Sequence, residues 1–489
     1  MNHPHRLSKS RVMAGLQCLK RLWWEVHEPD SPELAPDDRL RVIFDRGHRV
    51  GGLARAFVPG GVLIDLPYYD FEGRVSNTAR ALAEGAAAIY EASFFEAGIF
   101  VSVDILQRVQ GGFAVVEVKS TLDVKDAHIP DVAIQTHVAG LAGLRVARAE
   151  VMHLNRSCVY PDLSNLFVRD DVTEDVLNEL KTLPAQAESL LSTIAGPQPA
   201  VATGPHCTAP YECPFITRCW LPRPRHHVTT LYGLRADRAA ALVEDGYETL
   251  YDLPADFKGS EVATRQIRSV QAGKLIVEPG LQVELARFRR PIAFLDFETV
   301  NPAVPMWRGC HPYERVPVQF SCDVLEGEAL THHEWLASGP ADPREQIATS
   351  LIAVCQGVET LLAYNAPFER GCIDDLLSAL PHMKPELLAI RDRIKDLLPV
   401  VRNCVYHPDF CGRFGLKDVV PVLVPDFSYS DLAIQDGDAA AAALESLLFD
   451  AKSFAPDQLR SLRDDLLSYC RRDTLAMVGL FNRLQELAR

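Results

Sequence analysis

The segment from Pro291 to Thr299 constrains the fold of this 489-residue chain more than any other stretch. It reads Pro-Ile-Ala-Phe-Leu-Asp-Phe-Glu-Thr, so an apolar run leads into Asp296 and Glu298. A short apolar run after a proline predicts a buried strand, and residues i and i+2 of a strand point to the same face. The two carboxylates therefore project together near the end of a core element. Because buried like charges repel each other, the pair predicts a divalent cation between them.

The composition is that of an ordinary globular protein. Hydrophobic residues make up 47% of the chain and charged residues 24%, values typical of that class, and no run approaches the roughly 18 apolar residues of a membrane span. No apolar signal region follows the first residues, so we expect a cytoplasmic protein with free or metal-binding cysteines. The net charge of -15 predicts weak, salt-sensitive binding to nucleic acid outside any local basic channel.

The pattern along the chain predicts an α/β protein with three segments. Residues 1–224 are mixed and end in a stretch rich in cysteine and proline. Residues 225–285 predict short helices. Residues 286–489 begin with the carboxylate strand and finish with a long helical pattern. We therefore expect two larger domains joined by a small helical spacer.

A second pair of acidic residues lies in the first segment. Residues 100–108 and 113–119 both predict strands, and Gln-Gly-Gly between them is a hairpin signal. If the turn is centred between positions 110 and 111, facing residues have numbers that add to 221, and Asp104 lies opposite Glu117. Directly opposed residues have Cβ atoms roughly 4.5–5.5 Å apart, so this pair also predicts a cation. Lys119 shares the face of Glu117.

An Asp followed by Glu-x-Lys on the next strand resembles the PD-(D/E)XK nuclease core, with its restriction-endonuclease-like fold. The resemblance implies that Asp104 and Glu117 hold Mg²⁺ or Mn²⁺. Lys119 would then orient or deprotonate the attacking water, or stabilise charge on the phosphate. The alternative is a surface hairpin with a Glu–Lys pair.

Further polar residues occur in the order of the accessory positions of these nucleases: His48, Glu91 and Gln135. The resemblance implies that His48 is a metal ligand and that Gln135 contacts a phosphate or a base. Two plainer interpretations stay open, because His48 fits an ordinary histidine and Gln135 fits a buried structural amide.

The cysteines extend this resemblance. Cys207, Cys213 and Cys219 form a cluster bounded by prolines, and Cys18 lies far away in the sequence. One distant cysteine with three clustered ones is similar to RecB-like iron–sulfur nucleases, including CRISPR-adaptation nucleases and AddB-type subunits. This implies a [4Fe–4S] cluster that clamps the two ends of the first domain together. Thiolates also bind zinc, although structural zinc sites prefer shorter Cys-x2–4-Cys pairs. Buried, unligated thiols are the third interpretation.

Two further acidic signals follow the strand at Asp296. Residues 361–369 predict a strand that runs into Asn365-x-x-Phe-Glu369. Near the C-terminus, Tyr469 and Asp473 are spaced i and i+4 in a helical pattern, so they share a face. That face continues through apolar residues, and an Asp on a buried stripe is costly unless it is paired or ligated.

These signals resemble the three motifs of the DEDD exonuclease superfamily, and the tyrosine spacing resembles its DEDDy branch. The resemblance implies an RNase H-like fold in which Asp296, Glu298 and Asp473 hold two ions of Mg²⁺ or Mn²⁺. Tyr469 would position the attacking water. Two cations roughly 3.5–4 Å apart stabilise both the attacking and the leaving oxygen of a phosphodiester.

The fourth ligand departs from that pattern. The superfamily usually has Asp where this chain has Glu369, and Asp374 or Asp375 could take its place. Between the second and third motifs, residues 412–417 predict either a basic loop that contacts the DNA backbone or a solvated loop.

Residues 231–253 resemble a helix-hairpin-helix module, which offers backbone N–H groups to phosphates. The nearby Glu244 and Asp245 would repel phosphate, so a rigid spacer is the favoured interpretation. The whole chain resembles a bacterial family of RecB-type nucleases with a C-terminal exonuclease-like domain. This implies a cytoplasmic, metal-dependent nuclease acting on DNA or RNA. The alternative is a nucleic-acid-binding or regulatory iron–sulfur protein with one or both nuclease sites degenerate.

Overall fold

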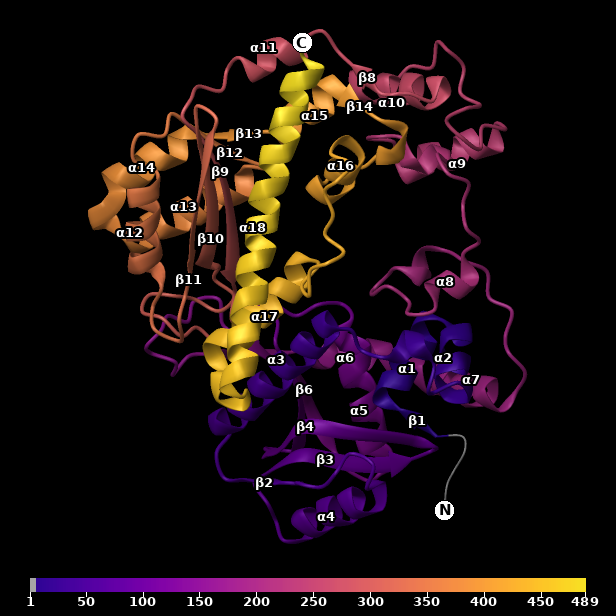
Figure 1. Ribbon diagram of the computed structural model, residues 1–489. Helices are drawn as coiled ribbons and strands as arrows, with labels where there is room; N and C mark the ends of the chain where they lie inside the picture. Colours follow the sequence, from indigo (N-terminus) through magenta and orange to yellow (C-terminus); the bar gives the residue numbers. More distant parts are fainter. Residues whose placement is uncertain (1–5) are drawn as a thin grey trace. The chain divides into compact units, whose positions relative to one another are not determined.

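The computed structural model describes residues 6–489, apart from the side chains at positions 38 and 39, and the chain forms two compact units (Figure 1). The first unit runs to Leu221 and includes Ala303–Tyr313, and the second comprises Pro222–Pro302 and Glu314–Arg489. Both units combine helices with mixed sheets, which confirms the α/β class. Within the described residues, no helix has the length and apolarity that a membrane crossing requires.

The first unit is built on a mixed sheet in the order β2-β3-β4-β5-β6-β7, with β1 beside β4. The pairs β2–β3, β5–β6 and β1–β4 are parallel, and the others are antiparallel. The strands are β1 (Leu7–Ser8), β2 (Gly61–Leu63), β3 (Ala88–Glu96), β4 (Ile99–Val109), β5 (Gly112–Lys119), β6 (Val146–Leu154) and β7 (Phe167–Asp171).

The β4–β5 hairpin has the register predicted from the sequence. Its pairs run from Ile105–Val116 to Val109–Gly112, so the numbers of facing residues add to 221. Gly112 has φ +151°, and a Cβ there would lie 2.1 Å from the carbonyl oxygen of Arg145. Only glycine fits this close approach to the residue before β6. The register of the hairpin itself is set by the two-residue turn at positions 110 and 111.

Helices cover the sheet of the first unit. The apolar helix α5 packs against β3, β4, β5 and β6 through buried side chains that include Val132, Ile134 and Val138. The helices are α1 (Lys9–Gln17), α2 (Leu19–His27), α3 (Asp38–Ala54), α4 (Phe71–Ala83), α5 (His128–Leu141), α6 (Thr173–Glu179), α7 (Leu183–Ala195) and α8 (Ile216–Cys219), with short 3₁₀ turns at Pro32–Leu34, Arg55–Phe57 and Pro205–Cys207.

The second unit is built on a mixed sheet in the order β11-β10-β9-β12-β13, with β9 in the middle. Strands β9, β10 and β11 pair antiparallel, and β9, β12 and β13 pair parallel. The strands are β9 (Ile292–Val300), β10 (Val316–Glu326), β11 (Ala329–Leu336), β12 (Thr360–Ala363) and β13 (Ile394–Asp396). The strands predicted at 291–299 and from 361 are thus confirmed.

The alternation along β9 divides its side chains between two cores. Leu295 and Phe297 pack with α12 (Arg344–Val354), α13 (Pro367–Ala379) and α14 (Lys384–Arg393) on one face. Ile292 and Phe294 pack on the other face, in the core that contains α18 (Pro456–Leu487), the long helix of Figure 1. Asp296 and Glu298 have even numbers, so they belong to the α18 face.

The predicted helical spacer is not a separate body, because residues 225–285 pack into the second unit. Val228 and Leu250 share a core with Phe410 and Leu480, and strand β8 pairs with β14. The boundary falls after Leu221 rather than after residue 224. The remaining elements of this unit are α9 (Ala236–Glu244), α10 (Glu261–Ala272), β8 (Ile276–Val277), α11 (Leu281–Leu285), α15 (Leu398–Cys404), β14 (Val405–Tyr406), α16 (Leu416–Leu423) and α17 (Gly437–Phe449), with short 3₁₀ turns at Val228–Thr230, Pro381–Met383, Pro408–Phe410 and Ala451–Ser453.

The segment Ala303–Tyr313, between β9 and β10, belongs to the first unit although the sequence places it in the last segment. Ala303 packs with Val50 and Leu154, and the hydroxyl of Tyr313 donates to the carbonyl of Ser120. Its partners lie more than a hundred residues away, so local sequence patterns do not reveal this assignment.

Candidate functional site

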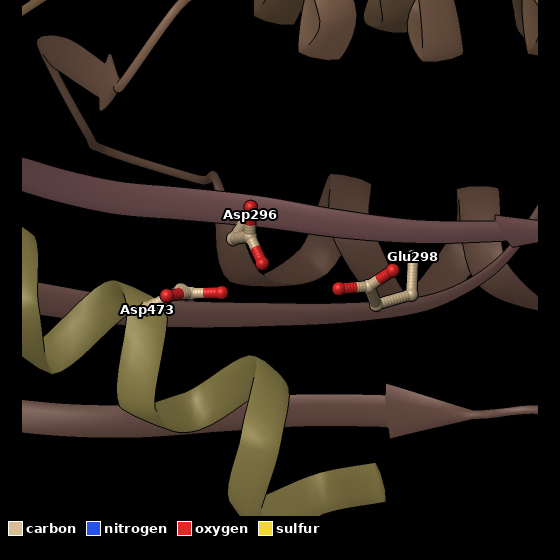
Figure 2. A group of neighbouring side chains, drawn as sticks. All are labelled: Asp296, Glu298 and Asp473. Atoms are coloured by element: carbon tan, nitrogen blue, oxygen red, sulfur yellow. The ribbon is translucent and has the colours of Figure 1, made fainter. Parts of the chain in front are cut away.

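Three carboxylates meet on the α18 face of the second sheet. Asp296 and Glu298 extend from β9, Asp473 extends from α18, and one carboxylate oxygen of each lies within 4.8 Å of the others (Figure 2). A metal ion can be shared by three or more His, Cys, Asp or Glu side chains only where their ligand atoms are close together. Within the described residues, this triad meets that condition. The period of the strand and the register of the helix therefore bring together residues 175 or more positions apart.

The electrostatics of this triad favour a bound cation. Burial and the charges of its neighbours raise the pKa of Asp296 well above its ordinary value, and the same causes raise the pKa of Glu298 to about 8. Burial also raises the pKa of Asp473. Carboxylate oxygens are the ligands that Mg²⁺ and Mn²⁺ prefer, so the donor set fits either ion. A dication would offset the mutual repulsion of the three acids.

Glu369 is the best-placed candidate for a fourth ligand. It lies in the first turn of α13 (Pro367–Ala379), its residue is 3% exposed, and its Oε2 has no hydrogen-bond partner among the described residues. Burial raises its pKa to about 8. The two alternatives are engaged elsewhere, because Asp374 pairs with Arg391 at 2.5 Å and Asp375 pairs with Arg315 at 2.7 Å.

Tyr469 lies beside the triad and is held by a lysine. The Nζ of Lys417 donates to the Tyr469 hydroxyl oxygen at 3.0 Å and lies 4.6 Å from the centre of its ring. The Tyr429 hydroxyl donates to Asp473 Oδ1 at 2.8 Å. The charge of Lys417 opposes the rise in the pKa of Glu298 and of Asp473. Lys417, in the first turn of α16, thus places a cation at the acidic site, in the stretch 412–417 for which the sequence left a basic loop and a solvated loop open.

A pocket opens at this site, and its lining combines acidic, basic and aromatic side chains. Asp296, Asp473 and the motif residue Asn365 line it together with basic Arg402 and Lys417. Aromatic side chains complete the wall: Tyr232, Tyr364 and Phe414. Tyr232 comes from the predicted spacer, which therefore contributes to the site itself.

The close packing behind the pocket depends on one glycine. Gly412 has φ +81°, and a Cβ there would lie 1.9 Å from the carbonyl oxygen of Thr230. Gln266 of α10 joins the same contact, donating to that carbonyl at 2.8 Å and accepting from the backbone N–H of Tyr232 at 2.8 Å. This arrangement holds the segment before Tyr232 against Gly412, four residues before α16, the helix that carries Lys417.

In the first unit, the predicted residues also come together. The Asp104 carboxylate accepts the backbone N–H of Val118 at 2.7 Å, next to the last paired residues of the hairpin. Glu117 accepts from Lys119 Nζ at 2.7 Å and from Gln135 Nε2 at 2.6 Å. Gln135 comes from α5 and is fully buried. The sequence therefore identified four members of one polar cluster.

His48 does not join this cluster by any contact that the described residues make. It lies on α3, and its side chain is exposed. Glu91, which has φ +60°, instead accepts from Arg55 at 3.1 Å and pairs with Arg74 at 3.5 Å. Its charge helps to raise the pKa of Asp104.

Two members of the first-unit cluster escaped the sequence analysis. Lys9 Nζ lies 2.8 Å from Glu117 Oε1 and 3.1 Å from Asp131 Oδ1. Asp131 also forms an ion pair with Lys119. Asp131 is four residues before Gln135 on α5, so helical spacing could have indicated it. Lys9 is 108 residues from Glu117, and no local signal links them.

The charges of this cluster shift the pKa values of its two central acids, Glu117 and Asp104, in opposite directions. Burial would raise the pKa of Glu117, but the ammonium groups of Lys9 and Lys119 hold it well below the ordinary range. Burial and the charge of Glu117 raise the pKa of Asp104 to about 8. Both oxygens of Glu117 and Oδ2 of Asp104 are already engaged by protein donors. In this arrangement, the residues do not fit a divalent cation between Asp104 and Glu117.

The four predicted cysteines line one enclosed space in the first unit. Cys18 ends α1, Cys207 lies in a 3₁₀ turn, and Cys219 ends α8. All twelve cysteines of the chain are free thiols. Burial raises the pKa of Cys213, as do Cys18 and Cys207 nearby. Sequence positions about 190 residues apart thus converge on one thiol cluster.

The spacing of these thiols is wider than zinc requires. Zn–S bonds of about 2.3 Å place tetrahedral sulfur ligands about 3.8 Å apart. Within the described part of the chain, no three of the four sulfur atoms lie within 4.8 Å of one another. Lys20 and Arg21 line the same space and supply positive charge. The donor set of four thiols suits a thiolate-bound metal group.

Comparison with known families gives one match. Residues 293–415 are similar to a family described as "Domain of unknown function (DUF2779)". The matched region includes Asp296, Glu298 and Glu369, and it ends before Lys417 and Asp473. A search of curated proteins returned no match.

Proposed function

We propose that the second unit is a metal-dependent nuclease site that hydrolyses phosphodiester bonds of DNA or RNA, with exonuclease-like architecture. The observation that supports this most strongly is the meeting of Asp296, Glu298 and Asp473 within 4.8 Å at a pocket lined by basic and aromatic residues. The resemblance to the DEDDy exonucleases adds support, as does the mixed sheet that carries the first motif on its central strand.

Mg²⁺ or Mn²⁺ held by these three acids, with Glu369 as a further ligand, would supply positive charge for the attacking and leaving oxygens. The protein residues have separate tasks. Lys417 donates to the oxygen of Tyr469, so the hydroxyl proton of this tyrosine remains available to orient a water or a phosphate oxygen. Tyr429 fixes Asp473 through its hydroxyl.

The pocket walls would bind the polymer. Arg402 and Lys417 offer positive charge to the phosphate backbone, and the faces of Tyr232, Tyr364 and Phe414 offer stacking surfaces for bases. Stacking on aromatic side chains is worth roughly 1–3 kcal/mol per base and tolerates any sequence. Such a pocket would overcome, locally, the repulsion expected from a net charge of -15.

For the first unit, we propose a RecB-like centre with a [4Fe–4S] cluster held by the four clustered cysteines, in a protein that resides in the cytoplasm. The convergence of these thiols on one space supports the cluster. Protein purified without oxygen should be brown and contain iron, and Cys213→Ser should lose both properties. A colourless, zinc-loaded protein would contradict this part of the proposal.

Cleavage of end-labelled DNA and RNA, single- and double-stranded, with free and blocked ends, tests the proposed activity. With Mn²⁺ present, the parent should degrade at least one of these polymers, and Asp296→Asn with Asp473→Asn should reduce cleavage to background. Asp457→Asn is the matched control, because this aspartate lies exposed on the same helix. If the double variant cuts as fast as the parent, the proposed site is wrong. If no polymer is cut by the parent, a binding or regulatory role is favoured.

A further inference from the structure

The ammonium group of Lys9 occupies the acidic cluster of the first unit. Its Nζ lies 2.8 Å from Glu117 Oε1 and 3.1 Å from Asp131 Oδ1, and Asp104 lies close enough for its charge to act on Lys9. Lys119, two residues after Glu117 on β5, contacts the same oxygen of Glu117 at 2.7 Å. A positive charge therefore stands where the resemblance to PD-(D/E)XK nucleases implies a divalent cation.

The fold holds Lys9 in this place from both sides. Immediately before it, Leu7 is fully buried and β1 pairs with β4, the strand that carries Asp104. Ser8 caps α1 by accepting the backbone N–H of Arg11 at 3.3 Å. At the other end of α1, Gln17 donates to the carbonyls of His206 and Tyr211, at 2.8 and 2.7 Å.

Lys9 is thus the first residue of a helix that is anchored at both ends. A surface lysine moves freely on its flexible stem, but here the backbone position is fixed and the side chain, 27% exposed, ends in the cluster. Its contacts are part of the fold rather than a chance conformation.

The charges of the cluster are nearly balanced without any added ion. Three carboxyl groups, those of Asp104, Glu117 and Asp131, face the two ammonium groups of Lys9 and Lys119. Gln135 donates to the remaining oxygen of Glu117, and the backbone of Val118 donates to Asp104. A divalent cation could reach Glu117 only by displacing one of these donors.

We propose that Lys9 is the resident cation of the first-unit cluster, so that a divalent cation binds between Asp104 and Glu117 only when Lys9 has left. Of the two lysines, Lys9 is the one expected to leave. Lys119 belongs to the same strand as Glu117 and shares its face, whereas Lys9 comes from a separate helix. The first centre is therefore closed to metal in the arrangement seen here. This inference does not depend on the activity proposed for the second unit.

Mn²⁺ binding to the full chain tests the proposal, with Asp296→Asn and Asp473→Asn introduced to remove the second site. Free Mn²⁺ is measured by electron paramagnetic resonance. In this background, the chain that retains Lys9 should have no Mn²⁺ site that depends on Glu117. Its Mn²⁺ binding should therefore be the same with and without Glu117→Gln. Adding Lys9→Met should create one site per chain, with at least a tenfold gain in affinity, and Asp104→Asn should remove it again. Lys181→Met, at an exposed lysine, should change nothing.

Two results would overturn the proposal. The first is Glu117-dependent Mn²⁺ binding of equal affinity whether Lys9 is present or replaced. The second is a Lys9→Met chain that keeps the parent circular dichroism and gains no site. If Lys9→Met fails to fold, the chain with intact Lys9 still decides the question, because Glu117-dependent Mn²⁺ binding by it contradicts a resident ammonium cation and its absence supports one.

Discussion

In the first unit, Glu117 lies between the ammonium groups of Lys9 and Lys119, whereas in the second unit Asp296 and Glu298 face another acid, Asp473. The pKa values move accordingly: that of Glu117 is held low by the two lysines against its burial, and that of Glu298 is raised to about 8 by burial and by Asp473. The acidic pair across the β4–β5 hairpin and the acidic pair along β9 thus differ in the charges that surround them. The first is neutralised from within the chain, and for the second we propose a cation from solution.

The largest expected effect is the destabilisation of the first unit when its internal ion pairs are lost. Glu117→Gln leaves Lys9 and Lys119 with only part of their counter-charge in a buried setting. Removing one partner of a buried ion pair destabilises a protein by about 3–5 kcal/mol. Urea unfolding in the presence of EDTA should show this loss in the transition of the first unit. An unchanged transition would mean that the ion pairs in this cluster contribute no net stability.

Replacing an acid by its amide in the second unit should have the opposite effect on the free energy of unfolding. Without divalent cations, Asp296→Asn removes repulsion from Asp473 and Glu298. Burial and these neighbouring charges raise the pKa of Asp296 well above its ordinary value, so its charge destabilises the fold and we expect Asp296→Asn to stabilise the chain at pH 8 in EDTA. Excess Mn²⁺ should reverse the order, because it stabilises only the parent site. Destabilisation in EDTA would contradict the mutual repulsion of the acids.

The pH dependence of stability sharpens this contrast. Glu298 has a pKa of about 8 in the folded chain and an ordinary value of 4.5. Between these values the folded state retains a proton that the unfolded state releases, so stability falls as pH rises, by at most about 1.4 kcal/mol per pH unit. Calorimetry in EDTA from pH 5 to 8 should show a shallower fall for Glu298→Gln than for the parent. Equal slopes would show that Glu298 does not retain its proton.

The smallest effect concerns the one lysine at the second site that contacts Tyr469. Lys417→Met should slow cleavage roughly tenfold, because the tyrosine loses the donor that orients its hydroxyl. Tyr469→Phe should cost a similar factor, and the double variant should be little slower than either single one, since residues that act through one contact are not additive. Lys395→Met, at an exposed lysine, should leave the rate unchanged. If the two losses of rate multiply in the double variant, Lys417 and Tyr469 act independently, which would contradict this prediction.

The sequence predicted the features that depend on local periodicity. The alternation of β9 placed Asp296 and Glu298 on one face, and the hairpin turn set the register that leads to Asp104 and Glu117. Helical spacing joined Tyr469 to Asp473. Each of these rests on residues within a few positions of one another, where strand and helix geometry decides the outcome.

Distant contacts escaped prediction where no family resemblance linked the residues, as it did for Cys18 and the three clustered cysteines. Lys9 reaches Glu117 across 108 positions and Tyr429 reaches Asp473 across 44, and neither residue stands out in its own segment. The spacer residues carry Tyr232 into the pocket because their apolar side chains share the core of the second unit. A segment that looks independent in sequence can thus complete a site elsewhere in the fold.

Crystals grown with Mn²⁺ and measured at the manganese absorption edge test the contrast between the two centres most directly. We expect anomalous peaks beside Asp296, Glu298 and Asp473 and none between Asp104 and Glu117, where Lys9 should remain. Peaks at the first centre with none at the second would contradict it.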